Sequence, residues 1–256
     1  MKIIAEVGSN WNDLEDLGKS VYMAKEDGAD AVKFQYFTAK ELYGFDVQSV
    51  DRYHVPLNVL QLLKATCNDA GIEFMCTAFS EQGYQQINHL VDTHKIASSE
   101  SHDMRLVSCV LAHHKPTILS TGGLSFSRIA RIIDMWNTMK HTELTLLYCD
   151  PTYPSHKWSG DILEGIMALQ RYGVDVGLSD HSTSTKWSTE IMGRLYVIEK
   201  HYNPLGFDNT PDAGHSLGRD NFRELVKNLR NSPTFYTDNP HKRVKTPVGY
   251  YRPFTR

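Results

Sequence analysis

The 256-residue sequence predicts an α/β protein built as one (β/α)8 barrel, also called a TIM barrel. Short runs typical of β-strands alternate with helical segments almost from end to end, which is typical of a parallel sheet with helical crossovers. Eight such units fit before residue 232, and a closed barrel of this kind takes about 250 residues. A doubly wound open sheet is the alternative, but no GxGxxG motif follows the first strand, where the chain reads Gly8-Ser9-Asn10-Trp11-Asn12.

The expected strands are mostly apolar on both faces, as strands covered by helices on one side and packed inside a barrel should be. They are Ile3–Val7, Ala31–Gln35, Glu73–Thr77, Thr93–Ala97, Thr117–Ser120, Thr145–Cys149, Asp175–Leu178 and Tyr196–Lys200.

The expected helices carry apolar residues at helical spacing. Leu14–Asp27 has them at positions 14, 17, 21 and 24 and ends before Gly28. Leu57–Ala70 begins after Pro56 and ends before Gly71, the usual order of the two helix-ending residues. The other six are Glu81–Leu90, Met104–His113, Ser127–Met139, Asp161–Tyr172, Lys186–Gly193 and Arg219–Arg230.

Two segments depart from this repeat. Residues 36–55 are too long for a βα loop, which usually has about 2–6 residues, and long loops at the carboxyl face of a barrel often shape the site. Residues 1–231 are expected to form the barrel. Residues 232–256 are rich in proline, aromatic and basic residues and are expected to form an extended C-terminal tail.

Composition excludes several classes of protein. With 27 Lys+Arg against 30 Asp+Glu, the net charge is −3, so nucleic acid is not an expected partner. No apolar run is long enough for a transmembrane helix, and Glu6 interrupts the N-terminal run too early for a signal peptide. The four cysteines form no CxxC pair, so we expect buried, reduced thiols and a cytoplasmic protein without a membrane partner.

Polar side chains end nearly every expected strand, and the carboxyl ends of barrel strands converge on one mouth. Lys33 and Lys95 follow apolar runs in strands that should be covered, and a buried ammonium is costly unless an anion pairs with it. Hydroxyl side chains at neighbouring strand ends are Ser98, Ser120 and Ser179. This set suits a phosphate and a carboxylate. Internal salt bridges to Glu6 or Glu100 are the alternative.

Two histidines end the last two expected strands. His181 and His201 would be neighbours across the mouth, where imidazole nitrogens with oxygen partners suit Mn²⁺, Fe²⁺, Co²⁺ or Zn²⁺. Structural roles for both histidines are the alternative.

Nine stretches in order resemble the catalytic barrel of the sialic acid synthases, which make N-acetylneuraminate and its legionaminate and pseudaminate relatives. They are residues 4–10, 28–35, 71–79, 95–100, 115–122, Tyr153-Pro154, 177–181, 198–201 and Pro211-Asp212. The resemblance covers roughly residues 3–230 and implies an enzyme that condenses phosphoenolpyruvate with an aldehyde sugar of the N-acylated hexosamine type. The products would be a nonulosonic acid and phosphate.

The resemblance also implies roles for individual residues. The catalytic set would be Glu100 as acid/base, Lys33, Lys95 and Glu6, with Glu6 near the water on the metal. Phosphoenolpyruvate would be held by the two lysines with Thr77, Ser98, Ser120 and Ser179. The substrate-binding set further includes Gln35, Phe79, Tyr153 and Asp212, of which Gln35, Tyr153 and Asp212 would contact the sugar. His181 and His201 would ligate a divalent metal, typically Mn²⁺.

The sequence also departs from the family. Trp11 stands between Asn10 and Asn12 where the family usually has histidine, and Pro151 replaces a family contact to phosphoenolpyruvate. The sequence is expected to lack the family's C-terminal antifreeze-like domain, and a homodimer is left open as its assembly. Two other functions remain as alternatives: a Schiff-base aldolase using Lys33 or Lys95, and a non-catalytic sugar-binding barrel derived from the family.

Overall fold

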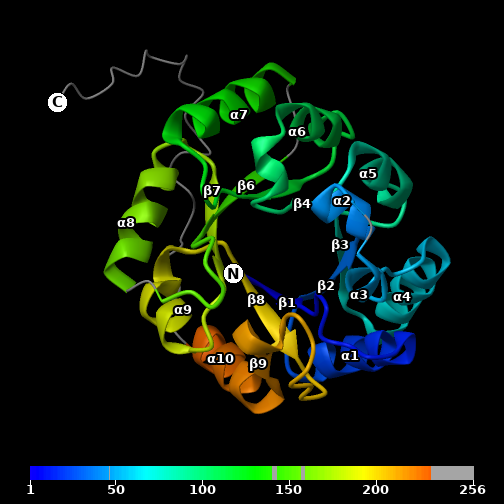
Figure 1. The fold of residues 1–256 in the computed structure, drawn as a ribbon. Helices are drawn as coiled ribbons and strands as arrows, with labels where there is room; N and C mark the ends of the chain where they lie inside the picture. Colours follow the sequence, from blue (N-terminus) through cyan, green and yellow to red (C-terminus); the bar gives the residue numbers. More distant parts are fainter. Residues whose placement is uncertain (46, 140–142, 157–158, 232–256) are drawn as a thin grey trace.

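Eight parallel strands form a ring that helices surround in the computed structural model, which describes residues 1–45, 47–139, 143–156 and 159–231 (Figure 1). The strands are β1 (Lys2–Glu6), β2 (Ala31–Tyr36), β3 (Glu73–Ala78), β4 (His94–Ile96), β5 (Thr117–Ser120), β6 (Leu144–Cys149), β7 (Asp175–Asp180) and β8 (Val197–Asn203). Their order is β3-β2-β1-β8-β7-β6-β5-β4, and β3 and β4 lie side by side where the ring meets. The predicted (β/α)8 barrel is therefore confirmed, and the open doubly wound sheet is excluded.

The surrounding helices follow the expected order. The larger ones are α1 (Leu14–Glu26), α4 (Leu57–Ala70), α5 (Glu81–Ile87), α6 (Met104–Leu111), α7 (Phe126–Met139), α8 (Ser159–Gln170), α9 (Lys186–Ile191) and α10 (Arg219–Asn231). Helix α4 has the predicted bounds, and its C-cap Gly71 is left-handed with φ 67°, a conformation that glycine adopts without steric cost.

The long segment between β2 and α4 contains two short helices that periodicity did not predict, α2 (Ala39–Tyr43) and α3 (Gln48–Asp51). Thr38 and Glu41 form a capping box at the start of α2, and Glu41 also accepts a hydrogen bond from Ser80 after β3. These bonds hold α2 above the carboxyl ends of β3 and β4 (Figure 1). The predicted tail, residues 232–256, lies outside the described residues.

The inside of the barrel is apolar at its amino-terminal end. Ile4, Ala31, Met75, Ile118, Leu147 and Val197 form a separate buried cluster there. Each lies on a strand that carries a polar or sulfur-containing inward residue two positions further on, because successive strand side chains point to opposite faces. The apolar layer therefore closes the floor beneath the mouth.

Two further sequence expectations concern the chain as a whole. Among the described residues, no helix is long and apolar enough to span a membrane. All four cysteines are free thiols; Cys67, Cys76 and Cys149 are buried as expected, whereas Cys109 is half-buried.

The last helix is joined to the first by a buried carboxylate. Asp27, directly after α1, accepts hydrogen bonds from Arg219 Nε at 3.0 Å, from Arg223 Nε at 2.6 Å and from the Tyr202 hydroxyl at 2.5 Å. Its side chain is fully buried, whereas the two arginines are partly exposed. This contact ties α10 and β8 to the start of the barrel.

Replacing Asp27 by alanine is therefore expected to lower the free energy of unfolding by about 2 kcal/mol, less than for a fully buried pair, because both guanidinium groups keep contact with water. Urea unfolding followed by circular dichroism would measure the change. The matched control is Asp220→Ala, since Asp220 is fully exposed and lies 3.9 Å from Arg223. Equal unfolding midpoints for the two variants would contradict this assignment.

Candidate active site

The carboxyl ends of the strands bring polar side chains to one mouth. The inward positions follow the two-residue strand period: Glu6 on β1, Lys33 and Gln35 on β2, Thr77 on β3, Ser120 on β5, Ser179 on β7, and Glu199 and His201 on β8. All but Gln35 are buried. Strand register places Glu6 opposite both Lys33 and His201.

Two lysines and two glutamates form a buried cluster at the centre of this mouth. Lys33 Nζ lies 2.8 Å from Glu6 Oε2 and 3.4 Å from Glu199 Oε2. Lys95 Nζ lies 3.4 Å from Glu199 Oε1. Every one of these side chains is at most 6% exposed, so their charges interact with little screening. The internal salt bridge to Glu6 is therefore present. The second carboxylate that pairs with the lysines is Glu199, whereas Glu100 is the residue expected from the sequence.

The cluster shifts the pKa values of its members. Burial raises the pKa of Glu6, and Lys33 only partly opposes this. Burial alone would also raise the pKa of Glu199, but Lys33 and Lys95 outweigh this effect and hold that pKa below its usual range. Burial lowers the pKa of Lys95, whereas Glu199 and Glu6 together hold the pKa of Lys33 above its ordinary value despite burial.

Hydroxyl groups complete the surroundings of the lysines. Lys33 donates to Thr77 Oγ1 at 3.2 Å, and Lys95 donates to Ser120 Oγ at 2.9 Å. Ser179 donates to Glu199 Oε1 at 3.0 Å. The structure thus brings Lys33, Lys95, Thr77, Ser120 and Ser179 together around the two glutamates.

A cavity of about 540 Å³ opens at the mouth beside this cluster. Four predicted site residues line it: Gln35, Phe79, Ser98 and Tyr153. Leu42 of α2 and Pro151 add apolar walls, so the unexpected helix α2 contributes to the cavity. Gln35 donates to Glu6 Oε1 at 3.0 Å and so connects the cavity to the charge cluster.

Glu100 lies at the carboxyl end of β4, the strand that carries Lys95. It begins a short 3₁₀ helix, Glu100–His102, after β4, and it is half-buried. Burial raises its pKa, and a hydrogen bond with Ser99 partly opposes the shift. Ser99 and His102, on either side of it, line the cavity.

Three side chains cluster on the opposite side of the mouth: His201, Asp212 and His215. His201 Nδ1 lies 3.7 Å from Asp212 Oδ2, and His215 Nε2 lies 3.4 Å from Asp212 Oδ1. The two imidazole rings pack edge to face at 4.5 Å. Among the described residues this is the only such group of three ligand-type side chains.

These side chains fit a divalent cation. His201 Nδ1 and His215 Nε2 are buried and have no hydrogen-bond partner among the described residues, so both nitrogens are available as ligands. Burial lowers the pKa of His201 to about 3. Burial alone would raise the pKa of Asp212, but His215 and His201 outweigh it and hold that pKa at about 2. Neutral imidazole and ionised carboxylate are the ligand forms, and two histidines with one carboxylate suit Mn²⁺, Fe²⁺, Co²⁺ or Zn²⁺.

His181, the other predicted ligand, lies outside this group of three. Its Nδ1 is 2.8 Å from the carbonyl oxygen of Asp150, which fixes that nitrogen as the donor. Its Nε2 therefore accepts, and it lies 3.1 Å from the Tyr153 hydroxyl and 3.2 Å from Ser179 Oγ. The His181 and His201 rings are 5.7 Å apart, so His181 borders the histidine–aspartate cluster. Its acceptor nitrogen faces Tyr153 and Ser179 at the mouth.

Residues of the first βα loop position Asp212. The backbone N–H of Ser9 donates to Asp212 Oδ2 at 2.8 Å. Asn10, which is fully buried, donates to Ser216 Oγ at 2.8 Å and accepts from Thr210 Oγ1 at 3.0 Å. The loop after β8 is therefore held against β1. The Trp11 indole donates to the Gly8 carbonyl and packs edge to face on Tyr53.

Two residues of the mouth had no role assigned from the sequence. Glu199 could have been found, because it stands two positions before His201 and so shares its strand face. His215 follows the strands, in the 3₁₀ helix Ala213–His215, and no sequence period relates it to His201. Asp212, for which the sequence predicts a sugar contact, lies between the two histidines.

Fold and site together define a (β/α)8 barrel whose mouth combines a buried lysine–glutamate cluster with a histidine–aspartate cluster. The sequence matches the NeuB family over residues 20–239. The N,N'-diacetyllegionaminic acid synthase of Legionella pneumophila is 30% identical over 91% of this chain and 72% of its own length. The pseudaminic acid synthase of Campylobacter jejuni is 28% identical over 92% of this chain and 75% of its own.

One solved structure is similar to this chain in both sequence and fold. The N-acetylneuraminic acid (sialic acid) synthetase of Leptospira borgpetersenii, in complex with citrate, superimposes with a TM-score of 0.83 at 26% identity, covering 89% of this chain and 82% of that one. The chain belongs to the NeuB family.

Gly8 is the position where the site tolerates a side chain least. Its φ is +56°, and a Cβ there would lie 2.1 Å from Asp212 Oδ2. Gly8→Ala is therefore expected to displace Asp212 and to weaken divalent-cation binding about tenfold or more, as loss of a supporting contact does at metal sites. Titration of Mn²⁺ followed by electron paramagnetic resonance measures this affinity.

Gly214→Ala is the matched control for Gly8→Ala. Gly214 lies in the loop that carries Asp212 and His215, but a Cβ there would meet nothing within 4 Å. Equal Mn²⁺ affinity of the two variants would show that Asp212 does not support cation binding.

Proposed function

We propose that this protein is a phosphoenolpyruvate-dependent synthase that condenses an aldehyde sugar of the N-acylated hexosamine type into a nonulosonic acid and releases phosphate. The observation that carries the proposal is the pairing of two sites at one mouth. Buried lysines with hydroxyl partners lie at the same mouth as a cluster of two histidines and an aspartate. The names of its relatives, which are synthases of legionaminic, pseudaminic and sialic acids, point to the same class of product.

Lys33 and Lys95 would bind the anionic groups of phosphoenolpyruvate, with Thr77, Ser98, Ser120 and Ser179 as hydroxyl donors. Charge-assisted hydrogen bonds from buried donors are the strong ones for phosphate and carboxylate groups. Lys33 and Lys95 already share Glu199, so their ammonium groups are held in place before the substrate arrives. A preorganised arrangement of this kind stabilises charge without reorganisation during the reaction.

The aldehyde sugar would occupy the 540 Å³ cavity, against Gln35, Phe79 and Tyr153. His201, Asp212 and His215, with His181 at their border, would hold a divalent cation, for which Mn²⁺ is our choice. Such a cation supplies Lewis-acid polarisation of an aldehyde oxygen.

In the reaction, C3 of phosphoenolpyruvate forms a bond to the aldehyde carbon, and positive charge develops at C2. The π pair of the aldehyde moves to its oxygen, which takes up a proton from water and becomes a hydroxyl group. Glu100 stabilises that charge and takes a proton from the water that adds to C2. The new hydroxyl group on C2 then gives its proton to the phosphate as the bond between C2 and the phosphate oxygen breaks, which leaves a keto acid and inorganic phosphate. Lys33 and Lys95 bind the departing phosphate.

A Schiff-base aldolase is the second candidate, and one observation favours it. Burial lowers the pKa of Lys95, and a lysine that loses its proton more readily is a better amine nucleophile. Borohydride would trap the covalent adduct of such an enzyme with pyruvate or a sugar. Inactivation by EDTA without any adduct would exclude it.

The proposed reaction is tested by phosphate release from phosphoenolpyruvate with Mn²⁺ and a panel of aldoses, including N-acetylmannosamine and 2,4-diacetamido-trideoxy hexoses. We expect release only when both an aldose and the cation are present. His201→Ala is expected to abolish release, and His89→Ala, which replaces an exposed histidine, serves as the matched control. If no aldose stimulates release, the synthase function is wrong.

Glu100→Gln keeps the shape of the side chain and removes its charge. We expect kcat to fall by about 10²–10⁴-fold, the usual contribution of a general acid or base, with little change in the KM for phosphoenolpyruvate. Steady-state kinetics over a range of phosphoenolpyruvate concentrations separates the two constants. Glu190→Gln, on α9 and 40% exposed, is the control; an unchanged kcat for Glu100→Gln would remove Glu100 from the catalytic set.

A further inference from the structure

Strand β8 carries one charged residue that faces away from the mouth. Lys200 stands between Glu199 and His201, which both point inward, so its side chain points toward the surrounding helices. It is completely buried, and its Nζ lies 2.9 Å from Asp180 Oδ2. Asp180 in turn precedes His181. One buried ion pair therefore joins the residues adjacent to both histidines.

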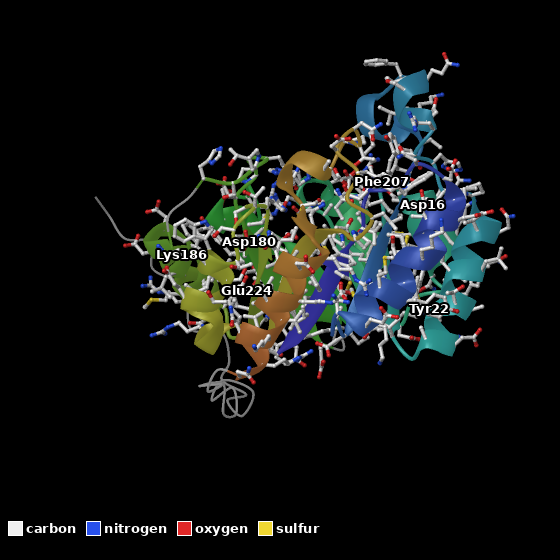
Figure 2. All side chains as sticks on the ribbon, turned by 90° about the horizontal axis from the view of Figure 1, so that it is seen from below. Asp16, Tyr22, Asp180, Lys186, Phe207 and Glu224 are labelled. Atoms are coloured by element: carbon white, nitrogen blue, oxygen red, sulfur yellow. The ribbon has the colours of Figure 1, made fainter. Side chains whose placement is uncertain are left out.

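The Lys200 ammonium is also bound by backbone carbonyl groups. Nζ donates to the carbonyl oxygen of Ser182 at 2.6 Å and to that of Ser184 at 3.0 Å. Asp180 accepts from the backbone N–H of Ser182 at 2.9 Å and from Ser188 Oγ at 2.6 Å. The turn after β7 is thus folded around the Lys200 ammonium group. Figure 2 labels Asp180 on the side of the barrel that carries Lys186 of α9 and Glu224 of α10.

We propose that Lys200 is a positioning residue, a proposal that rests on the function proposed above: by holding the turn at Ser182–Ser184, it orients His181 toward the cation-binding side of the mouth. The turn is the part of the chain that leaves His181. The carbonyl of His181 also accepts from the backbone N–H of Ser155, and its Nδ1 donates to Asp150. A shift of the turn would therefore break the contacts that set the imidazole.

The physical reason is the cost of losing the ammonium. Without it, the carbonyl groups of Ser182 and Ser184 would lose the Lys200 donor, and the Asp180 carboxylate would keep its bonds from Ser182 and Ser188 but lose its counter-charge. In a dry interior each of these losses carries a penalty. The turn can reduce that penalty only by moving toward water. The competing explanation is that Lys200 does no more than neutralise Asp180, in which case removal of both charges would restore the site.

Two variants separate these explanations. Lys200→Met keeps most of the length of the side chain and removes every donor. Asp180→Asn combined with Lys200→Met also removes the unpaired charge, so the buried ion pair is replaced by neutral groups, which is often tolerated in protein interiors. We expect the double variant to fold with a thermal midpoint close to that of the wild type. Its Mn²⁺ affinity and kcat are nevertheless expected to fall by about 10–100-fold, as when a supporting contact of a metal site is lost.

A third readout does not depend on metal or activity. The imidazole ¹⁵N resonances of His181 are expected to shift in the double variant, because Nδ1 loses its fixed partner. Ser188→Ala is the matched control, since it removes one hydrogen bond to Asp180 and leaves all contacts of Lys200 in place. It should keep the wild-type resonances and Mn²⁺ affinity.

The outcomes are distinct. A double variant that matches the wild type in resonances and Mn²⁺ affinity would overturn the positioning role, and so would one that does not fold, since Lys200 would then serve stability alone. A wild-type protein that neither binds Mn²⁺ nor releases phosphate would instead overturn the proposed function. The resonances of His181 would still decide the role of Lys200 in that case.

Discussion

The buried cluster of Lys33, Lys95, Glu6 and Glu199 is the interaction on which the rest of this structure depends. Four ionisable groups without contact to bulk water are tolerated only if each has a close partner of opposite charge. The closed ring of strands meets that condition, because it surrounds one interior with β1, β2, β4 and β8, where Lys33 reaches both glutamates and Lys95 reaches Glu199. In an open sheet of the same strand order, β4 would be four strands from β8, so Lys95 could not pair with Glu199.

Because of the two-residue strand period, the two faces of β7 and β8 carry polar residues with different contacts. Ser179, Glu199 and His201 face the mouth, whereas Asp180 and Lys200 face the helices and hold the turn that follows β7. Beneath the charged layer, apolar residues such as Ile4 and Val197 fill the floor of the barrel. The charges are thus confined to one end, where a cavity gives them access to a ligand.

The histidine–aspartate cluster depends on a contact between distant parts of the chain. Asp212 and His215 lie in the loop after β8, and that loop is held by Ser9 and Asn10 from the first βα loop. The strands alone supply only His201. The loops after β1 and β8 must therefore meet before the histidine–aspartate cluster can form. Closure of the barrel is thus a condition for the proposed chemistry.

The sequence by itself determined the barrel, the order of its eight units and most of the inward polar residues, because period-two and helical patterns are local properties of the chain. It also placed Lys33, Lys95 and His201 correctly at one mouth. Only the tertiary structure decided that Glu199 rather than Glu100 pairs with the lysines, that His215 joins His201 and Asp212, and that α2 walls the cavity. These contacts join residues that no local period relates, and their distances are set by closure of the ring and by loop conformation.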